Sequence, residues 1–213
     1  MDFRVNILGV FLLWVCGASV AADLEAGKKI VLQGNGKAAT ACNACHGAGG
    51  DGSVTASFPR LSHLDADYLA KQLRDFQRDK RHDAVMHPIA KTLSENEIVD
   101  VSAYFAAQTP TAPPEKVDPA LATRGARIAL SGLWEKNVPA CISCHGPGGH
   151  GVGAHFPALA GQYAGYTSKQ LNAWRSGTRS NDPQDLMKGI AQRLSAADIA
   201  AVSAYFASQP AKN

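Results

Sequence analysis

Four cysteines and two histidines form the same five-residue pattern twice in this chain of 213 residues. The pattern Cys-x-x-Cys-His comprises Cys42, Cys45 and His46 in the first half of the chain and Cys141, Cys144 and His145 in the second. Two thiols at this spacing lie within one turn of chain, where each can add to one vinyl group of a single haem. The histidine that follows is then held beneath the iron as the proximal ligand. The pattern predicts two haem c groups, each covalently attached.

Two other uses of Cys-x-x-Cys fit this chain less well than haem attachment. A redox dithiol has no need of an adjoining histidine, whereas here the histidine follows both cysteine pairs. A zinc site that shared the two pairs would join two halves of the chain that otherwise repeat as independent units. Haem attachment is therefore the favoured interpretation of both motifs.

Two methionines, Met86 and Met187, are candidates for the sixth ligand of each iron. Each stands seven residues before a leucine of an equivalent Leu-Ser pair, at Leu93 and Leu194. A lone methionine is ordinarily core filler, but that role does not explain one methionine at the same place in each half. A thioether favours ferrous iron and raises the reduction potential. We predict that His46 pairs with Met86 and that His145 pairs with Met187.

Pro59 and Pro157 are candidates for orienting the proximal histidines. Each lies in a Phe-Pro-x-Leu segment that occurs once in each half. A haem-ligating histidine usually donates its second ring N–H to a fixed acceptor, and these proline carbonyls are suitable acceptors. The alternative is two ordinary loop prolines. The five remaining histidines lack an equivalent in the other half and are interpreted as exposed or structural: His63, His82, His87, His150 and His155.

The chain is an internal repeat with a period near 100 residues. The segment Val-Ser-Ala-Tyr-Phe-Ala closes both halves, at residues 101–106 and 202–207. A period of this length indicates a duplicated domain rather than a solenoid unit. Four prolines between residues 110 and 119 favour an extended, semi-rigid connector. We therefore expect a first domain at residues 23–109, a linker at 110–118 and a second domain at 119–213.

Each half is expected to be mostly helical. Helices are predicted at residues 23–33, 65–79 and 119–131, and a closing helix in each half begins at a capping sequence, at Ser94 and at Ser195. The glycine-rich stretches 47–52 and 146–153 are expected to be loops. No segment alternates polar and apolar residues with the period of a strand. The sequence predicts an all-α fold of two small domains, each around one haem.

The first 22 residues have the shape of a secretory signal peptide. One basic residue, Arg4, precedes an apolar stretch, and small residues lead up to a cleavage position after Ala21 or Ala22. An uncleaved membrane anchor is the alternative. A signal peptide predicts a periplasmic protein. The net charge of +3 is too small to indicate nucleic-acid or anionic-membrane binding.

Together, the two haem motifs, the two Phe-Pro-x-Leu segments, the two methionines and the Ala-Tyr-Phe-Ala endings resemble the cytochrome c4 family. The resemblance covers the whole chain after the signal segment. It implies two class I cytochrome c domains related by a pseudo-two-fold axis, with haem propionates facing each other across the interface. It also implies redox protein partners, an upstream reductase and a downstream oxidase, and no small-molecule substrate. Docking on a membrane surface is left open. The segment from Arg81 to Met86 is three residues shorter than that from Arg179 to Met187, so the two irons are expected to differ.

Three functions are compatible with these features. The main hypothesis is an electron carrier that serves a terminal oxidase of a respiratory chain. The second is the electron-accepting subunit of a periplasmic dehydrogenase, for example of the flavocytochrome type. The third is a di-haem peroxidase, which needs an iron with a vacant or labile sixth position. The paired methionines argue against the third, because they would fill both sixth positions.

Overall fold

The computed structural model describes residues 21–212, so the predicted signal segment lies almost wholly outside the described residues. The first half contains α1 (Leu24–Gln33), α2 (Asn43–His46), α3 (Ala66–Gln77), α4 (Met86–Lys91) and α5 (Glu95–Ala106). The second half contains α6 (Pro119–Ser131), α7 (Ile142–His145), α8 (Ala164–Ser176), α9 (Leu186–Arg193) and α10 (Ala196–Ala207). Single 3-10 turns lie at Trp134–Lys136, Pro147–Gly149 and Pro183–Asp185.

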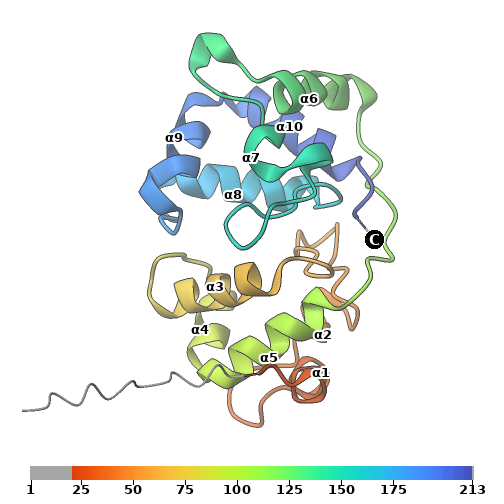
Figure 1. Ribbon diagram of the computed structural model, residues 1–213, viewed down its shortest axis with the longest axis vertical. Helices are drawn as coiled ribbons and strands as arrows, with labels where there is room; N and C mark the ends of the chain where they lie inside the picture. Colours follow the sequence, from red (N-terminus) through yellow and green to blue (C-terminus); the bar gives the residue numbers. More distant parts are fainter. Residues whose placement is uncertain (1–20, 213) are drawn as a thin grey trace, which may run out of the picture.

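The two halves form two stacked domains with the same order of helices (Figure 1). Helices α3 and α8 lie on the facing sides of the domains, and the connecting segment runs along one edge of the molecule (Figure 1). Pairing between extended segments within residues 21–212 is limited to isolated bridges, such as the one between Arg81 and Arg179. The predicted all-α fold is confirmed.

The ends of the longer helices follow the sequence signals. The Asp23 side chain accepts hydrogen bonds from two backbone N–H groups of α1, and the Asp118 side chain accepts one from the N–H of Ala120 in α6. Both closing helices begin with a complete capping box, Ser94 with Glu97 in α5 and Ser195 with Asp198 in α10. The predictions of capped closing helices at these positions are confirmed.

Each domain is held together by a close crossing of its first and last helices. A Cβ added to Gly27 in α1 would lie 2.2 Å from the carbonyl oxygen of Asp100 in α5. A Cβ added to Gly125 in α6 would lie 2.0 Å from the carbonyl oxygen of Ala201 in α10. No side chain fits in that space, so a glycine at the crossing point allows the two helix backbones to touch.

Each domain has its own apolar core beside this crossing. Ile98 of α5 and Ile199 of α10 occupy equivalent positions in the two cores and are fully buried. The closing helices thus contribute to both the crossing and the core, which explains why their sequences match best between the halves. The repeated segments 101–106 and 202–207 lie within these two helices.

Two pairs of short helices were not predicted from the sequence. Helices α2 and α7 carry the Cys-x-x-Cys-His motifs, and α4 and α9 carry the methionines. The three additional residues of the second domain form the 3-10 turn Pro183–Asp185 immediately before α9. Helices of four to eight residues contain too few turns to show a hydrophobic period, so the pattern could not reveal them.

The connecting segment is hydrogen-bonded to both domains rather than loosely tethered. The backbone N–H of Thr111 donates to Asp51 of the first domain at 3.0 Å. The backbone N–H of Glu115 donates to Ala207 of the second domain at 2.9 Å, and the Glu115 carboxylate accepts from the N–H of Ala164 at 2.9 Å. These contacts are consistent with a semi-rigid connector, while its boundaries at residues 110 and 118 stay a prediction.

Replacing Gly125 with alanine is expected to destabilise the second domain by roughly 2–3 kcal/mol, because the new methyl group would force α6 and α10 apart. Chemical denaturation of the haem-loaded protein measures this loss. Gly189→Ala is the matched control in the same domain. Its added Cβ would meet only the flexible end of Arg193, at 3.3 Å, so its stability should equal or exceed that of the wild type. Equal stability of the Gly125→Ala variant would contradict the role of the crossing.

Candidate functional site

The histidines of the two motifs are buried and have fixed orientations. His46 ends α2 and His145 ends α7, and their exposed fractions are 6% and 7%. The Nδ1 atom of His46 lies 3.0 Å from the carbonyl oxygen of Pro59, and that of His145 lies 2.7 Å from the carbonyl oxygen of Pro157. A carbonyl oxygen can only accept, so Nδ1 carries the proton in each ring. In the neutral ring, Nε2 then keeps a free lone pair with which to bind a metal.

The Phe-Pro-x-Leu segments also place an aromatic ring beside each histidine. The ring centres of Phe58 and His46 are 6.3 Å apart, and those of Phe156 and His145 are 6.2 Å apart. The loop after His46 must pass close to this segment. Gly52 has a positive φ of 76°, and a Cβ there would lie 2.4 Å from the carbonyl oxygen of Phe58. Glycine therefore allows the loop to close against the segment that orients the histidine.

The protonation states of the motif residues fit a haem attachment site. Burial lowers the pKa of both His46 and His145, so the neutral imidazole required of an iron ligand is favoured. Burial raises the pKa of the Cys42 thiol to about 11 and that of Cys141 to about 11. A dithiol oxidoreductase instead needs a thiol with a lowered pKa.

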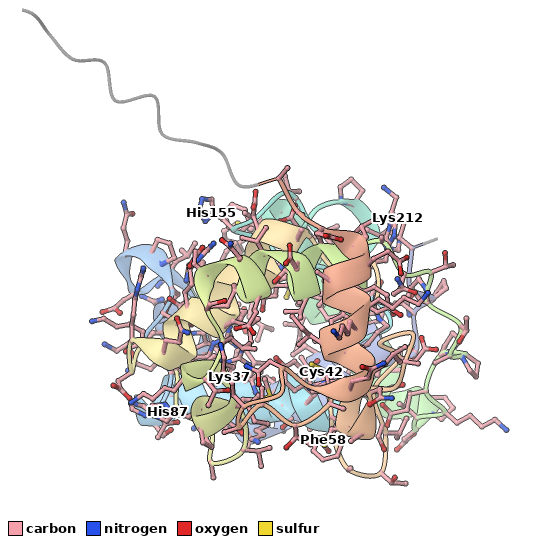
Figure 2. The ribbon with its side chains drawn as sticks, turned by 90° about the horizontal axis from the view of Figure 1, so that it is seen from below. Lys37, Cys42, Phe58, His87, His155 and Lys212 are labelled. Atoms are coloured by element: carbon pink, nitrogen blue, oxygen red, sulfur yellow. The ribbon has the colours of Figure 1, made fainter. Side chains whose placement is uncertain are left out.

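All four motif cysteines are unpaired and only partly buried in the described chain. Figure 2, the view from below, shows Cys42 toward the middle of the first domain, and α1 and α5 lie around the middle of that domain. A pair of thiols on the same helical turn as a histidine with a free nitrogen is the donor set that a haem c requires. The residues present therefore fit this cofactor in both domains.

The two methionines stand at the beginning of equivalent helices. Met86 is the first residue of α4 and Met187 is the second residue of α9. Each helix start is held by an aspartate: Asp83 accepts from the backbone N–H of Met86 at 3.1 Å, and Asp182 accepts from the N–H of Lys188 at 2.9 Å. The pairing of each methionine with its histidine stays a prediction.

Asp83 also forms an ion pair with Lys169 of the other domain at 2.7 Å. Burial alone would raise the pKa of Asp83. Hydrogen bonds from Lys169 and from the backbone N–H groups of Met86 and Val85 outweigh this effect and lower the pKa. The carboxylate is therefore ionised at neutral pH, so that one charge both caps the methionine-bearing helix and links the two domains.

Two buried arginines, one from each domain, meet at the domain interface. Arg81 donates to the side-chain oxygens of Gln170 at 2.8 Å and Gln72 at 3.1 Å, and to the hydroxyl of Tyr166 at 2.7 Å. Arg179 donates to the same oxygens, of Gln72 at 3.0 Å and Gln170 at 2.9 Å. Equivalent residues thus contact each other reciprocally, which is the pattern that a two-fold axis produces.

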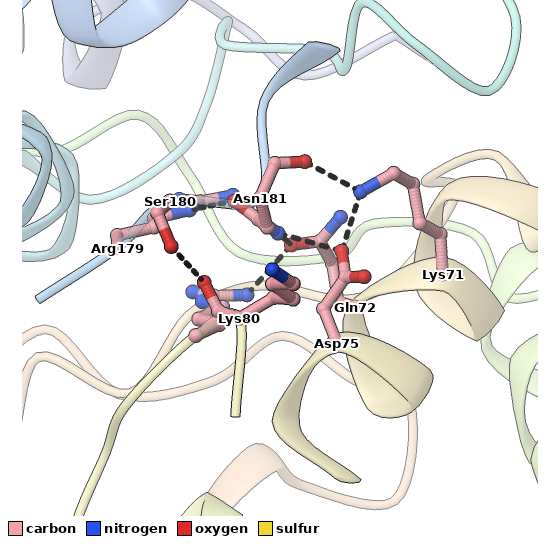
Figure 3. Close-up of polar contacts among 8 residues, drawn as sticks. Lys71, Gln72, Asp75, Lys80, Arg179, Ser180 and Asn181 are labelled. Carbon is pink, nitrogen blue, oxygen red and sulfur yellow. Dashed lines mark hydrogen bonds and ion pairs between the residues drawn. The ribbon is translucent and has the colours of Figure 1, made fainter. Parts of the chain in front are cut away.

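Further contacts from α3 reach the strand-like segment around Arg179 (Figure 3). The Lys71 ammonium group donates to the carbonyl oxygen of Asn181 at 2.7 Å, and the Asn181 amide donates to Asp75 at 2.8 Å. The backbone N–H of Ser180 donates to the carbonyl oxygen of Lys80 at 2.9 Å. The interface is therefore built from hydrogen bonds around the two guanidinium groups.

The two guanidinium groups carry positive charge that the surrounding side chains do not neutralise. Their exposed fractions are 6% for Arg81 and 3% for Arg179, and within residues 21–212 neither is within ion-pair distance of a carboxylate. Arg81 lies over the ring of Phe76 at 4.6 Å and Arg179 over that of Trp174 at 3.9 Å. Burial and then the neighbouring Arg81 lower the pKa of Arg179. Such a pair calls for an anionic group nearby, since an unpaired buried charge is costly.

These arginines were not predicted from the sequence to be functional residues. The signal was present, because Arg81 and Arg179 begin equivalent segments before the two methionines. Their partners were not foreseeable, since Arg81 and Gln170 are 89 residues apart and belong to different domains.

A second set of contacts joins the domains next to Pro59. The backbone N–H of Arg60 donates to the side-chain oxygen of Gln162 at 3.0 Å, and the Gln162 amide donates back to the carbonyl oxygen of Arg60 at 2.9 Å. The Tyr163 hydroxyl donates to the carbonyl oxygen of Asp51 at 2.6 Å. The second domain therefore supports the same loop that orients His46.

Comparisons with known proteins agree with this architecture. The family model described as "Cytochrome c" matches residues 122–210, and that of "Cytochrome C oxidase, cbb3-type, subunit III" matches residues 29–105. The thiosulfate dehydrogenase electron acceptor of Stutzerimonas stutzeri is 48% identical, with 94% of this chain and 93% of that protein aligned. Cytochrome c4 of Pseudomonas aeruginosa is 40% identical, with 94% of this chain and 98% of that protein aligned.

Two solved structures resemble the whole two-domain arrangement. Reduced cytochrome c4 from Pseudomonas stutzeri matches with a TM-score of 0.79 and 36% identity, covering 89% of this chain and 100% of that one. Thiosulfate dehydrogenase from Marichromatium purpuratum matches with a TM-score of 0.82 and 41% identity. That match covers 88% of this chain but only 40% of the longer Marichromatium chain.

Arg179→Gln is expected to loosen the domain interface, because it removes the donors to both shared glutamine oxygens and the stacking on Trp174. Hydrogen exchange of the interdomain amides of His82 and Ser180 should accelerate by about tenfold or more, as for a loss of some 1.4 kcal/mol in local stability. Arg175→Gln, at an exposed position of α8 a few residues earlier, is the control and should leave this exchange unchanged. Equal protection in the Arg179→Gln variant would mean that the arginine pair does not hold the domains together.

Proposed function

Because the chain belongs to the cytochrome c4 family of di-haem electron carriers, we propose that it takes electrons from a thiosulfate-oxidising dehydrogenase and passes them to a terminal oxidase. The protein would then be both an electron carrier for an oxidase and the electron acceptor of a dehydrogenase. Its place of action is the periplasm, as the N-terminal segment suggests.

The choice of electron donor rests on the relatives. A protein 48% identical to this chain is named as the electron acceptor of thiosulfate dehydrogenase. The Marichromatium thiosulfate dehydrogenase contains, within one longer chain, a region that superposes on both domains. These two similarities favour thiosulfate dehydrogenase over a flavin-bearing sulfide dehydrogenase as the donor.

The proposed iron ligands are His46 with Met86 in the first domain and His145 with Met187 in the second. Cys42 and Cys45 would hold one haem and Cys141 and Cys144 the other. When bound, a haem c supplies an iron that accepts and releases one electron. The chain keeps each imidazole neutral and fixed by the carbonyl of Pro59 or Pro157.

This ligand set supports a carrier rather than an enzyme. A peroxidase needs an iron with an open or labile sixth position, and a methionine in each domain would close both. The aspartates at the starts of α4 and α9 support this assignment, because they fix the backbone beside each methionine. We therefore propose that the protein has no small-molecule substrate of its own.

Arg81 and Arg179 are proposed to offset the charge of the haem propionates at the domain interface. The two guanidinium groups are buried, lie together and lack a carboxylate partner among the described residues. Positive charge close to a haem favours its reduced form, which carries one positive charge fewer. The pair would thus raise both potentials and keep the propionates within the interface.

The N-terminal segment supports a periplasmic location for the protein. In the described residues, no helix is of sufficient length and apolar character to cross a membrane. We propose that residues 1–22 are removed on export, that residues 23–109 and 119–213 are the two haem domains, and that 110–118 is the linker. N-terminal sequencing of the exported protein tests the cleavage position.

Met187→Ala should open the sixth position of the second iron only. The weak red absorption band that reports methionine bound to ferric iron should fall to about half its amplitude, because one of two such bonds is lost. A high-spin signal should appear. Leu186→Ala is the matched control, since the neighbouring side chain is 47% exposed. An unchanged low-spin spectrum in the Met187→Ala variant would refute the ligand assignment.

The proposed electron donor is tested by mixing the purified, oxidised protein with thiosulfate and a catalytic amount of thiosulfate dehydrogenase. We expect both haems to become reduced, with two electrons stored per chain, as followed by the rise of the reduced alpha band. Thiosulfate without the dehydrogenase should give no reduction on the same time scale. If the dehydrogenase reduces a small-molecule acceptor but not this protein, the proposed donor is wrong. Reduction of this protein's haems by a chemical reductant would still show that it is an electron carrier.

A further inference from the structure

Two histidines and an aspartate gather where the end of α3 meets the start of α4 in the first domain. Asp79 follows the end of α3, His82 lies in the segment before α4, and His87 is the second residue of α4. One ligand atom from each side chain lies within 4.8 Å of the others. His87 is at the periphery of the domain in the view from below (Figure 2).

The distances suit a tetrahedral metal ion. The Nε2 atom of His87 lies 3.4 Å from the Oδ1 atom of Asp79. Two ligands of one tetrahedral zinc ion lie about 3.3 Å apart, given bonds of about 2.0–2.1 Å. The ring centres of His82 and His87 are 6.2 Å apart, and a ligand atom of the exposed His82 lies within 4.8 Å of those of Asp79 and His87, so a side-chain rotation would bring it to ligand distance.

The backbone holds the three positions in place without a metal. The N–H of His82 donates to the carbonyl oxygen of Thr178 in the second domain at 3.1 Å, and that of His87 donates to the carbonyl oxygen of Asp83 at 3.0 Å. Asp79 adopts a left-handed conformation with φ of 56°, which aspartate tolerates better than most residues. The second carboxylate oxygen of Asp79 faces Lys91 at 3.7 Å, which leaves the first oxygen for a metal.

The His87 ring lacks ordinary hydrogen-bond partners. Its Nδ1 atom is buried and unpartnered among the described residues, and its Nε2 atom has only the ion-pair contact with Asp79. With the ring proton on Nδ1, the Nε2 atom presents its lone pair toward the Asp79 carboxylate, and a cation between the two would satisfy both groups.

The second domain provides an internal comparison, because it has none of the three side chains. Gly177, Ser180 and Lys188 stand at the positions equivalent to Asp79, His82 and His87. The segment before Met86 is also three residues shorter than its counterpart, which brings His82 and His87 close together. The cluster belongs to the first domain alone and is not part of the repeated haem site.

We propose that Asp79, His82 and His87 bind a divalent transition-metal ion of the zinc class, with water as the fourth ligand. Two imidazoles and a carboxylate are the donor set of many zinc sites. The bound ion would fasten the end of α3 to the first turn of α4, which begins at Met86. The site is independent of the proposed electron donor.

The test is calorimetric titration of the haem-loaded protein with zinc chloride after dialysis against a chelator. Zinc is the probe of choice because it has no redox chemistry with the haems. We expect saturable binding of one zinc ion per chain, and no comparable binding of magnesium, which prefers oxygen ligands. X-ray absorption at the zinc edge should show two imidazole nitrogens.

His82→Ala and Asp79→Asn should each weaken zinc binding by about tenfold or more, since each removes a ligand. Asparagine also tolerates the left-handed backbone, so the second variant tests the carboxylate without disturbing the fold. His155→Ala, an exposed histidine of the second domain, is the control and should bind zinc as the wild type does. An unchanged alpha band verifies that each variant is folded. No saturable binding by the wild type, or equal affinity in the His82→Ala variant, would overturn the proposal.

Discussion

The hydrogen bond from a buried imidazole to a proline carbonyl is the constraint around which each domain is arranged. It fixes which ring nitrogen carries the proton and leaves the other free. The loop after the histidine must fold back to present that carbonyl, which is why Gly52 lies against Phe58. In the first domain the second domain also helps to hold this carbonyl in place. The backbone N–H and the carbonyl oxygen of the next residue, Arg60, are both hydrogen-bonded to the Gln162 side chain. The orientation of one ring thus depends on both domains.

The interface contains more hydrogen bonds and ion pairs than would be needed merely to keep the two cofactor pockets close together. Arg81 and Arg179 share the same pair of glutamine oxygens, so movement of either domain would leave buried donors unpaired. Asp83 connects the methionine-bearing helix α4 to Lys169 of the other domain. Charged groups held by both domains therefore lie directly beside the helix that carries Met86. Electron transfer between two such centres takes place in a scaffold that resists relative motion.

Local signals in the sequence predicted the features that depend on nearby residues. The haem motifs, the capping boxes at Ser94 and Ser195 and the duplication were all readable, because each rests on short spacings or on direct repetition. The helices that carry the motifs and the methionines were missed because they are too short to show a period. The resemblance implied an interface between the domains, but its side chains were missed for a different reason: Arg81 meets Gln170 only after both domains have folded and docked. The Asp79, His82 and His87 cluster was likewise hidden, since three spaced side chains converge only where α3 and α4 meet.

The reciprocal contacts of Arg81 and Arg179 make the interface self-complementary, and this has a consequence for how such a chain arises. Two copies of a single domain can form a self-complementary interface before any linker joins them. Gene fusion of such a dimer would preserve the arginine contacts and would then free each half to change alone. The one-sided grip of Gln162 on Arg60 and the metal-ligand cluster confined to the first half have the character of later additions. The molecule thus combines reciprocal contacts around Arg81 and Arg179 with contacts that only one of the two halves makes.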